Sequence, residues 1–282
     1  MSILFIIQFV IASASFAQEE TQPPKSIEEY TKEATALIND KKMNEALQIA
    51  SELMKQYPDS PDGLTMAAYI QAKAGNPVKA KEFLQELLWK NPDFAPAHFL
   101  LGSLYYSQNC ITQAILAFQR YLILQPQGAN AQNAIGVVHR VLITKATRNE
   151  EGKIEIFFNL GGNCNDCDLE SALVAAQMKS SFDSLLGTTP AKPISQFSQT
   201  YGEFFFNLPD AIKKNSSCFA ANFYAPYFIE LRKKGYTLPL IVHIYTVSNI
   251  EDFDEWFGKE RNKKKIEEFI EWSRNYKFTK PS

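Results

Sequence analysis

Three prolines, Pro58, Pro92 and Pro126, lie 34 residues apart, and each closes a stretch with the same order of apolar and small residues. A unit of this length that ends in proline is typical of a helix–turn–helix repeat. Such units stack on their neighbours and bury a shared apolar face. The period therefore predicts three stacked helical hairpins, at residues 27–60, 61–94 and 95–128.

The predicted second helix of each hairpin carries an alanine at the point of closest contact with the first helix. These residues are Ala46, Ala80 and Ala114. A larger side chain at this point would push the paired helices apart. The repeated alanine therefore supports the same hairpin in all three units.

With these residues the chain resembles the tetratricopeptide repeat family. The third unit carries the family pattern most fully, in Leu101, Gly102, Tyr105, Ala114, Phe118 and Pro126. The first two units depart from it, because Glu33-Ala34 and Ala67-Ala68 stand in place of Leu-Gly. The resemblance implies a helical solenoid over residues 27–146 that binds other proteins and does not catalyse a reaction.

Residues 129–144 continue the apolar phase of the repeats as one further helix. No partner helix follows, because the polar stretch RNEEG at residues 148–152 breaks the pattern. A stacked array needs a capping element at its open apolar end. We therefore interpret residues 129–144 as a capping helix.

The N-terminus begins with an apolar stretch at residues 3–12, followed by the small residues Ser15 and Ala17. This order is typical of a secretory signal peptide, and the stretch is too short for a membrane span. It predicts a signal peptide at residues 1–17, cleavage after Ala17, and a flexible leader at residues 18–26. An uncleaved anchor stays open as the alternative, since the first residues carry no Lys or Arg. The favoured location is the periplasm or the exterior, with no integral membrane span after cleavage.

Composition argues against several classes of function. The formal net charge is −2 and the isoelectric point is near 6.0, which gives no electrostatic case for binding nucleic acid. The sequence contains no HExxH or GxSxG motif and no glycine-rich phosphate loop. Its three histidines, His98, His139 and His243, are spread along apolar segments. The sequence therefore favours a protein without catalytic residues, metal or cofactor.

The region of residues 150–282 holds 22 of the 36 aromatic residues, which predicts a compact domain. Alternation in residues 153–159 indicates a short strand. Helices are expected at residues 169–186, 194–207, 208–214, 220–234 and 252–276, whereas residues 238–247 fit either a helix or a strand. The expected fold is mainly α, with at most a small β element. This region weakly resembles the C-terminal parts of uncharacterised exported bacterial repeat proteins, a likeness that implies no activity.

Cys164 and Cys167 form the single CxxC motif and are candidates for a disulfide. A CxxC at the start of a helix also allows a thiol–disulfide oxidoreductase with Cys164 and Cys167 as catalytic residues, because a helix N-terminus stabilises a thiolate. Asp166 and Asp168 oppose that role, because they disfavour another negative charge nearby. Cys110 and Cys218 complete the set, and four cysteines allow three full pairings. A zinc site lacks enough ligands.

In this family the first helix of each unit lines a binding groove. The repeat register places nine residues there: Thr31, Thr35, Thr65, Tyr69, Phe99, Ser103, Tyr106, Asn133 and Arg140. Grooves that grip a C-terminal carboxylate present Lys and Asn, whereas the three repeats here present hydroxyls and aromatic rings. The predicted partner is therefore a protein or peptide segment with apolar anchors. In the alternative, Tyr69 and Tyr106 only pack against neighbouring repeats.

These observations predict an exported, non-catalytic scaffold or assembly factor of the cell envelope. The main alternative is the thiol–disulfide oxidoreductase, with the repeats recruiting its clients. A third hypothesis is a small-ligand pocket at the aromatic run of residues 223–228, although the continuity of that run favours core packing.

Overall fold

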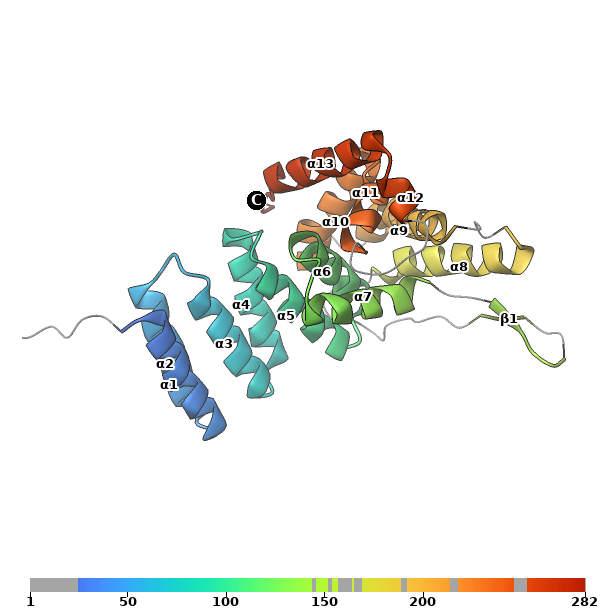
Figure 1. Ribbon diagram of the computed structural model, residues 1–282. Helices are drawn as coiled ribbons and strands as arrows, with labels where there is room; N and C mark the ends of the chain where they lie inside the picture. The colour runs from blue at the N-terminus through green and yellow to red at the C-terminus, as the bar shows by residue number, and fades with distance from the viewer. Residues whose placement is uncertain are drawn as a thin grey trace, which may run out of the picture.

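The computed structural model describes residues 25–143, 146–151, 154–156, 164, 169–188, 192–213, 218–245 and 253–281. Helical hairpins stack from α1 at one end towards α7, and the remaining helices gather around α6 (Figure 1). The repeat helices are α1 (Ile27–Asn39), α2 (Met43–Gln56), α3 (Asp62–Lys73), α4 (Pro77–Lys90), α5 (Ala95–Ser107) and α6 (Ile111–Leu124). The fold is therefore mainly α, as the sequence predicts.

The turns inside the three hairpins repeat the same geometry every 34 residues. Lys41, Gly75 and Asn109 each adopt a positive φ, at 62°, 78° and 60°. The next residue then donates its N–H to the carbonyl five residues earlier, from Lys42 to Leu37, from Asn76 to Gln71 and from Cys110 to Tyr105. A left-handed residue followed by this bond is a standard helix C-cap. The period seen in the sequence is thus also a period of the backbone.

Close contact within each hairpin depends on the predicted small residues. Ala46, Ala80 and Ala114 are fully buried. A Cβ atom on Gly102 would lie only 2.8 Å from the Phe118 ring, so any other residue would have to displace that ring where α5 meets α6. The small residues therefore set the spacing of the paired helices.

The capping helix is α7 (Ala129–Leu142), which packs on α6. It leads into a short antiparallel hairpin of β1 (Ala146–Arg148) and β2 (Ile154–Ile156). This hairpin is the small β element that was expected.

The C-terminal helices are α8 (Glu170–Leu186), α9 (Pro193–Lys213), α10 (Phe219–Lys233), α11 (Thr237–Ile244), α12 (Phe253–Phe257) and α13 (Glu260–Asn275). Two predictions need correction. In place of the two helices expected at residues 194–207 and 208–214, the structure has the single helix α9, which continues through Pro209 while Phe205, Leu208 and Ala211 stay buried. In place of the single helix expected at residues 252–276, it has α12 and α13, which separate between Phe257 and Glu260. None of the helices in the described ranges has the length and apolar character needed to cross a membrane.

Helix α6 is the centre of the molecule. Its residues from Ile111 to Ile123 are all buried, and it contacts α5 and α7 on one side and α8, α10 and α11 on the other. One apolar core runs from Leu64 in the second repeat to Phe269 in α13. The third repeat therefore has its outer face covered by the C-terminal helices.

Arg120 of α6 links the third repeat to the C-terminal helices. Its side chain is 1% exposed, and the guanidinium forms an ion pair with Asp93 and donates to Ser273 Oγ at 2.8 Å. The same group lies 4.8 Å from the ring centroid of Tyr227 and 5.3 Å from that of Phe278. The guanidinium thus stacks between two aromatic rings, and this stacking stabilises it in addition to the ion pair. A planar guanidinium can stack in this way, whereas an ammonium cannot. The C-terminal tail is thereby held against the third repeat.

His98 of α5 is a second buried polar link. Its Nε2–H donates to the Pro92 carbonyl oxygen at 2.9 Å, and its Nδ1 accepts from the Tyr224 hydroxyl of α10 at 2.8 Å. Burial, together with the positive charge of Arg120, lowers the pKa of His98 to about 3. Burial also raises the pKa of Tyr224 well above its usual value. Both side chains are therefore neutral in the folded protein at neutral pH.

Candidate functional site

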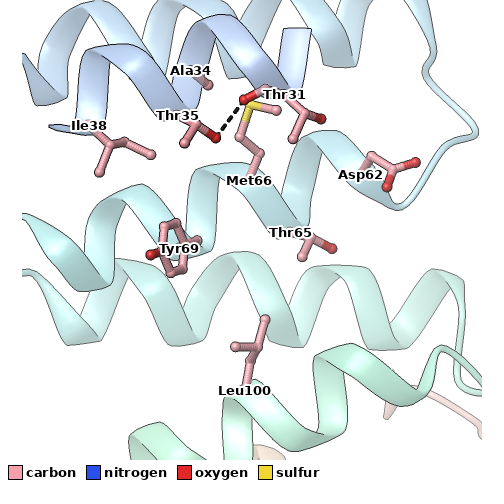
Figure 2. Close-up of a pocket in the computed structure, with 9 residues that line it drawn as sticks. All are labelled: Thr31, Ala34, Thr35, Ile38, Asp62, Thr65, Met66, Tyr69 and Leu100. Carbon is pink, nitrogen blue, oxygen red and sulfur yellow. Dashed lines mark hydrogen bonds between the residues drawn. The ribbon is translucent and has the colours of Figure 1, made fainter. Parts of the chain in front are cut away.

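Two neighbouring cavities lie on the face formed by the first helices of the repeats. The larger, about 390 Å³, is lined mainly by α1 and α3, and Figure 2 shows its residues: Thr31, Ala34, Thr35, Ile38, Asp62, Thr65, Met66, Tyr69 and Leu100. The smaller, about 210 Å³, is lined by Ala68, Tyr69, Ala72, Leu84, Leu100, Ser103 and Leu104. Tyr69 and Leu100 border both. We call the two cavities together the α1–α3–α5 groove.

Tyr69 lies at the junction of the two cavities. Its side chain is 45% exposed, although it belongs to a helix whose other large apolar residues are mostly buried. The Lys73 ammonium lies 5.5 Å from the centre of its ring. Packing against neighbouring repeats, the alternative role for Tyr69, therefore leaves nearly half of the residue exposed to solvent. An exposed tyrosine beside an apolar cavity can bury a large area on binding at low entropic cost.

The hydroxyls of the groove are already engaged by their own helices. Thr31 and Thr35 of α1 donate to the carbonyl oxygens of Ile27 and Thr31, at 2.8 and 2.7 Å. Thr65 of α3 and Ser103 of α5 make the same bond four residues back, each at 2.8 Å. A hydroxyl has one donor, so these oxygens keep only acceptor capacity towards a ligand.

Five of the nine predicted groove residues line the cavities: Thr31, Thr35, Thr65, Tyr69 and Ser103. Phe99 does not, because its ring packs on Phe118 and Tyr121, and Leu100 lies in the groove instead. Tyr106, Asn133 and Arg140 are exposed on α5 and α7 and line neither cavity.

Several residues that line the groove were not predicted from the sequence. Ile38 and Asp62 lie three residues from Thr35 and Thr65, so they share a helix face with them. Extending the register by one turn in each direction identifies both residues. The apolar floor, made by residues such as Ala72 and Leu84, carries no distinct signal because such residues occupy every helix interface.

The structure corrects the disulfide expected within the CxxC motif. Cys164 is bonded to Cys110, at the start of α6, and Cys218 is disulfide-bonded as well. Cys167 lies outside the described residues, and no described cysteine is free. The oxidoreductase alternative expects Cys164 to pair with Cys167, which is not the pairing in the structure. The spacing of the four cysteines does not distinguish the possible pairings, so the disulfide connectivity could not be predicted from the sequence.

The Cys110–Cys164 bond lies beside a second link at the same helix end. Glu170 of α8 accepts hydrogen bonds from the Thr112 backbone N–H at 3.3 Å and from the Thr112 hydroxyl at 2.9 Å. A carboxylate at a helix N-terminus satisfies an otherwise unpaired N–H and complements the helix dipole. Disulfide and carboxylate together fasten α6 to the C-terminal region.

Digestion of the unreduced, denatured protein with two proteases, one that cleaves before aspartate and one that cleaves after lysine and arginine, tests this pairing. Cleavage before Asp166 separates Cys164 from Cys167, and cleavage after Arg120 separates Cys110 from Cys164. Mass spectrometry should then find the peptide of Cys110 joined to that of Cys164. A link between Cys164 and Cys167 would contradict the structure. Reduction before digestion, as the control, should release both peptides.

The aromatic run at residues 223–228 is part of the core. Phe223, Tyr224, Tyr227 and Phe228 are each 1% exposed or less. Their rings stack on one another and on neighbours such as Trp89 and Phe278. Core packing, which the continuity of the run favoured, is therefore correct.

Comparison with the curated proteins gives no match. The model of the tetratricopeptide repeat family matches residues 30–60 and 62–93. These stretches cover the hairpins α1–α2 and α3–α4, which supply most of the groove. The first two hairpins of this chain are tetratricopeptide repeats, a module through which proteins bind other proteins.

Proposed function

We propose that this protein is an exported, non-catalytic scaffold or assembly factor of the cell envelope, which holds a partner protein in the α1–α3–α5 groove. The observation that carries the proposal is the groove itself. Two adjoining cavities lie on the helices that tetratricopeptide repeats use for binding, and Tyr69 stands exposed between them.

The C-terminal helices support this assignment because they limit where a partner can bind. They cover the outer face of the third repeat through α6, Arg120 and Tyr224. The face that carries the groove is left open. The C-terminal region then acts as a rigid base for the repeats.

Export is supported by two features of the chain. The apolar stretch at residues 3–12 with small residues up to Ala17 fits a cleaved signal peptide, although residues 1–24 lie outside the described part. The Cys110–Cys164 bond suits an oxidising compartment such as the periplasm.

Affinity capture from envelope extract with the chain from Gln18 onward tests the function. Tyr69→Ala should weaken partner retention by roughly thirtyfold, the effect of truncating an aromatic hot spot worth about 2 kcal/mol. Tyr69 is exposed, so the helical content and melting temperature should stay unchanged.

Phe182→Ala is the matched control. Phe182 has the same 45% exposure as Tyr69 but lies on α8, away from the groove. It should leave retention intact. Equal retention by Tyr69→Ala and wild type would overturn the groove assignment. Phe99→Ala is unsuitable, because Phe99 packs within the hairpin.

A further inference from the structure

The polar groups of the α1–α3–α5 groove are nearly all hydrogen-bond acceptors. Four hydroxyls already donate their hydrogen bonds to backbone carbonyl oxygens four residues earlier in the chain. The lining residues of the two cavities include no Lys, Arg, His, Asn or Gln, and Tyr69 alone adds another hydroxyl. A carboxylate of a partner would find almost no donors here, whereas N–H groups would find acceptors.

Asp62 gives the groove a negative end. Its carboxylate borders the larger cavity and accepts one hydrogen bond, from Ser60 Oγ at 2.5 Å. Within the described part of the chain it forms no ion pair. Asp62 lies in the first turn of α3, and Figure 2 shows it at the end of the cavity beyond Thr65 and Thr31.

Lys73 makes the charge at the two ends of α3 different. It lies near the opposite end of α3, where its ammonium approaches the Tyr69 ring. Asp62 and Tyr69 are seven residues apart on one helix, or about 10 Å along its axis. An extended peptide covers that distance in about three residues. A partner segment that fits both ends must therefore place its positive charge towards Asp62.

Resting on the proposed function, we propose that the α1–α3–α5 groove binds a basic, apolar-anchored peptide segment. A bulky apolar side chain of the partner enters the cavity between Tyr69 and Leu100. An arginine or lysine about three residues away pairs with the Asp62 carboxylate. The lining accommodates this occupant because its apolar floor takes the anchor and its acceptors take N–H groups.

Selection from a displayed library of short random peptides on the chain from Gln18 onward tests the inference. The enriched peptides should combine a large apolar residue with Arg or Lys about three residues away. A synthetic copy should bind Asp62→Asn roughly tenfold more weakly than wild type, because a charge-assisted hydrogen bond is lost. Repeating the selection on Asp62→Lys should replace the basic residue by Asp or Glu.

Asp59→Asn is the matched control. Asp59 precedes Asp62 by three residues, is exposed, and lines neither cavity. It should leave binding unchanged. Peptides that need Tyr69 but carry no basic residue, or that bind Asp62→Asn as tightly as wild type, would overturn this inference and leave the groove function standing. Enriched peptides that bind Tyr69→Ala as tightly as wild type, or no enrichment, would overturn both.

Discussion

Replacing the exposed Asp93 by alanine is expected to cost more stability than replacing the buried Arg120 by methionine. The side chain of Asp93 is 57% exposed, whereas that of Arg120 is 1% exposed. Loss of Asp93 leaves a buried guanidinium without its counter-charge, which costs about 3 kcal/mol. For a chain of this size, that corresponds to a melting temperature lower by about 6–12 °C.

Arg120→Met removes the charge itself and leaves no buried charge unpaired. Asp93 returns to water, and Ser273 keeps its hydrogen bond from the Tyr227 hydroxyl at 2.8 Å. Methionine fills most of the space between the Tyr227 and Phe278 rings. The expected cost is about 1 kcal/mol, in line with replacements of buried ion pairs by apolar residues.

Thermal unfolding of the single and double variants measures this coupling. With methionine at position 120, Asp93→Ala should cost almost nothing further, because no charge remains to be stranded. Asp59→Ala is the control: Asp59 is the equivalent exposed residue one repeat earlier and forms no ion pair in the described structure. If the costs of Asp93→Ala and Arg120→Met simply add, the two residues are not coupled.

The repeat geometry was predictable from the sequence because it depends on local rules. The prolines, Ala46, Ala80 and Ala114 fix the period and the closest helix contacts, and the backbone turns follow the same spacing. Most C-terminal helices were predictable for the same reason, since their apolar residues recur at helical spacing.

The covering of α6 depends on long-range packing and was not predicted. A signal for it is present, because a helix that is apolar on every side is buried on every side. The α6 sequence ITQAILAFQRYLIL has apolar residues on every side, since Leu116 and Ile123 lie on the face that also carries its polar residues, and its Arg120 and Gln119 are fully buried. The 34-residue period ends at the capping helix, so it does not predict which C-terminal helices cover α6.

The part of the groove that α1 and α3 form was predictable from the repeat register, whereas the predicted residues Tyr106, Asn133 and Arg140 line neither cavity. In α1 and α3 the four residues that the register predicted line the larger cavity: Thr31, Thr35, Thr65 and Tyr69. In α5 the apolar pair Phe99-Leu100 fits two faces equally well. Packing against Phe118 decides that Phe99 turns into the hairpin and Leu100 into the groove.

Mild acid should destabilise the protein through His98. Its pKa is about 3 in the folded state and about 6.5 in an unfolded chain. The unfolded state therefore binds the extra proton between these values, and stability falls as the pH drops through that window by about 1.4 kcal/mol per unit. At pH 5 the loss is about 2 kcal/mol relative to pH 7. The pKa of His243 is also lowered by burial, which adds to the loss in the same direction.

His98→Gln isolates this contribution, because glutamine does not titrate. The variant is less stable than wild type near pH 8, since the hydrogen bonds to Pro92 and Tyr224 are changed. The difference between the two proteins, measured by urea unfolding, should be constant above about pH 7 and should shrink steadily as the pH falls below about 6.5. A difference that stays constant down to pH 4 would mean that His98 titrates alike in both states, and the buried neutral imidazole would be wrong.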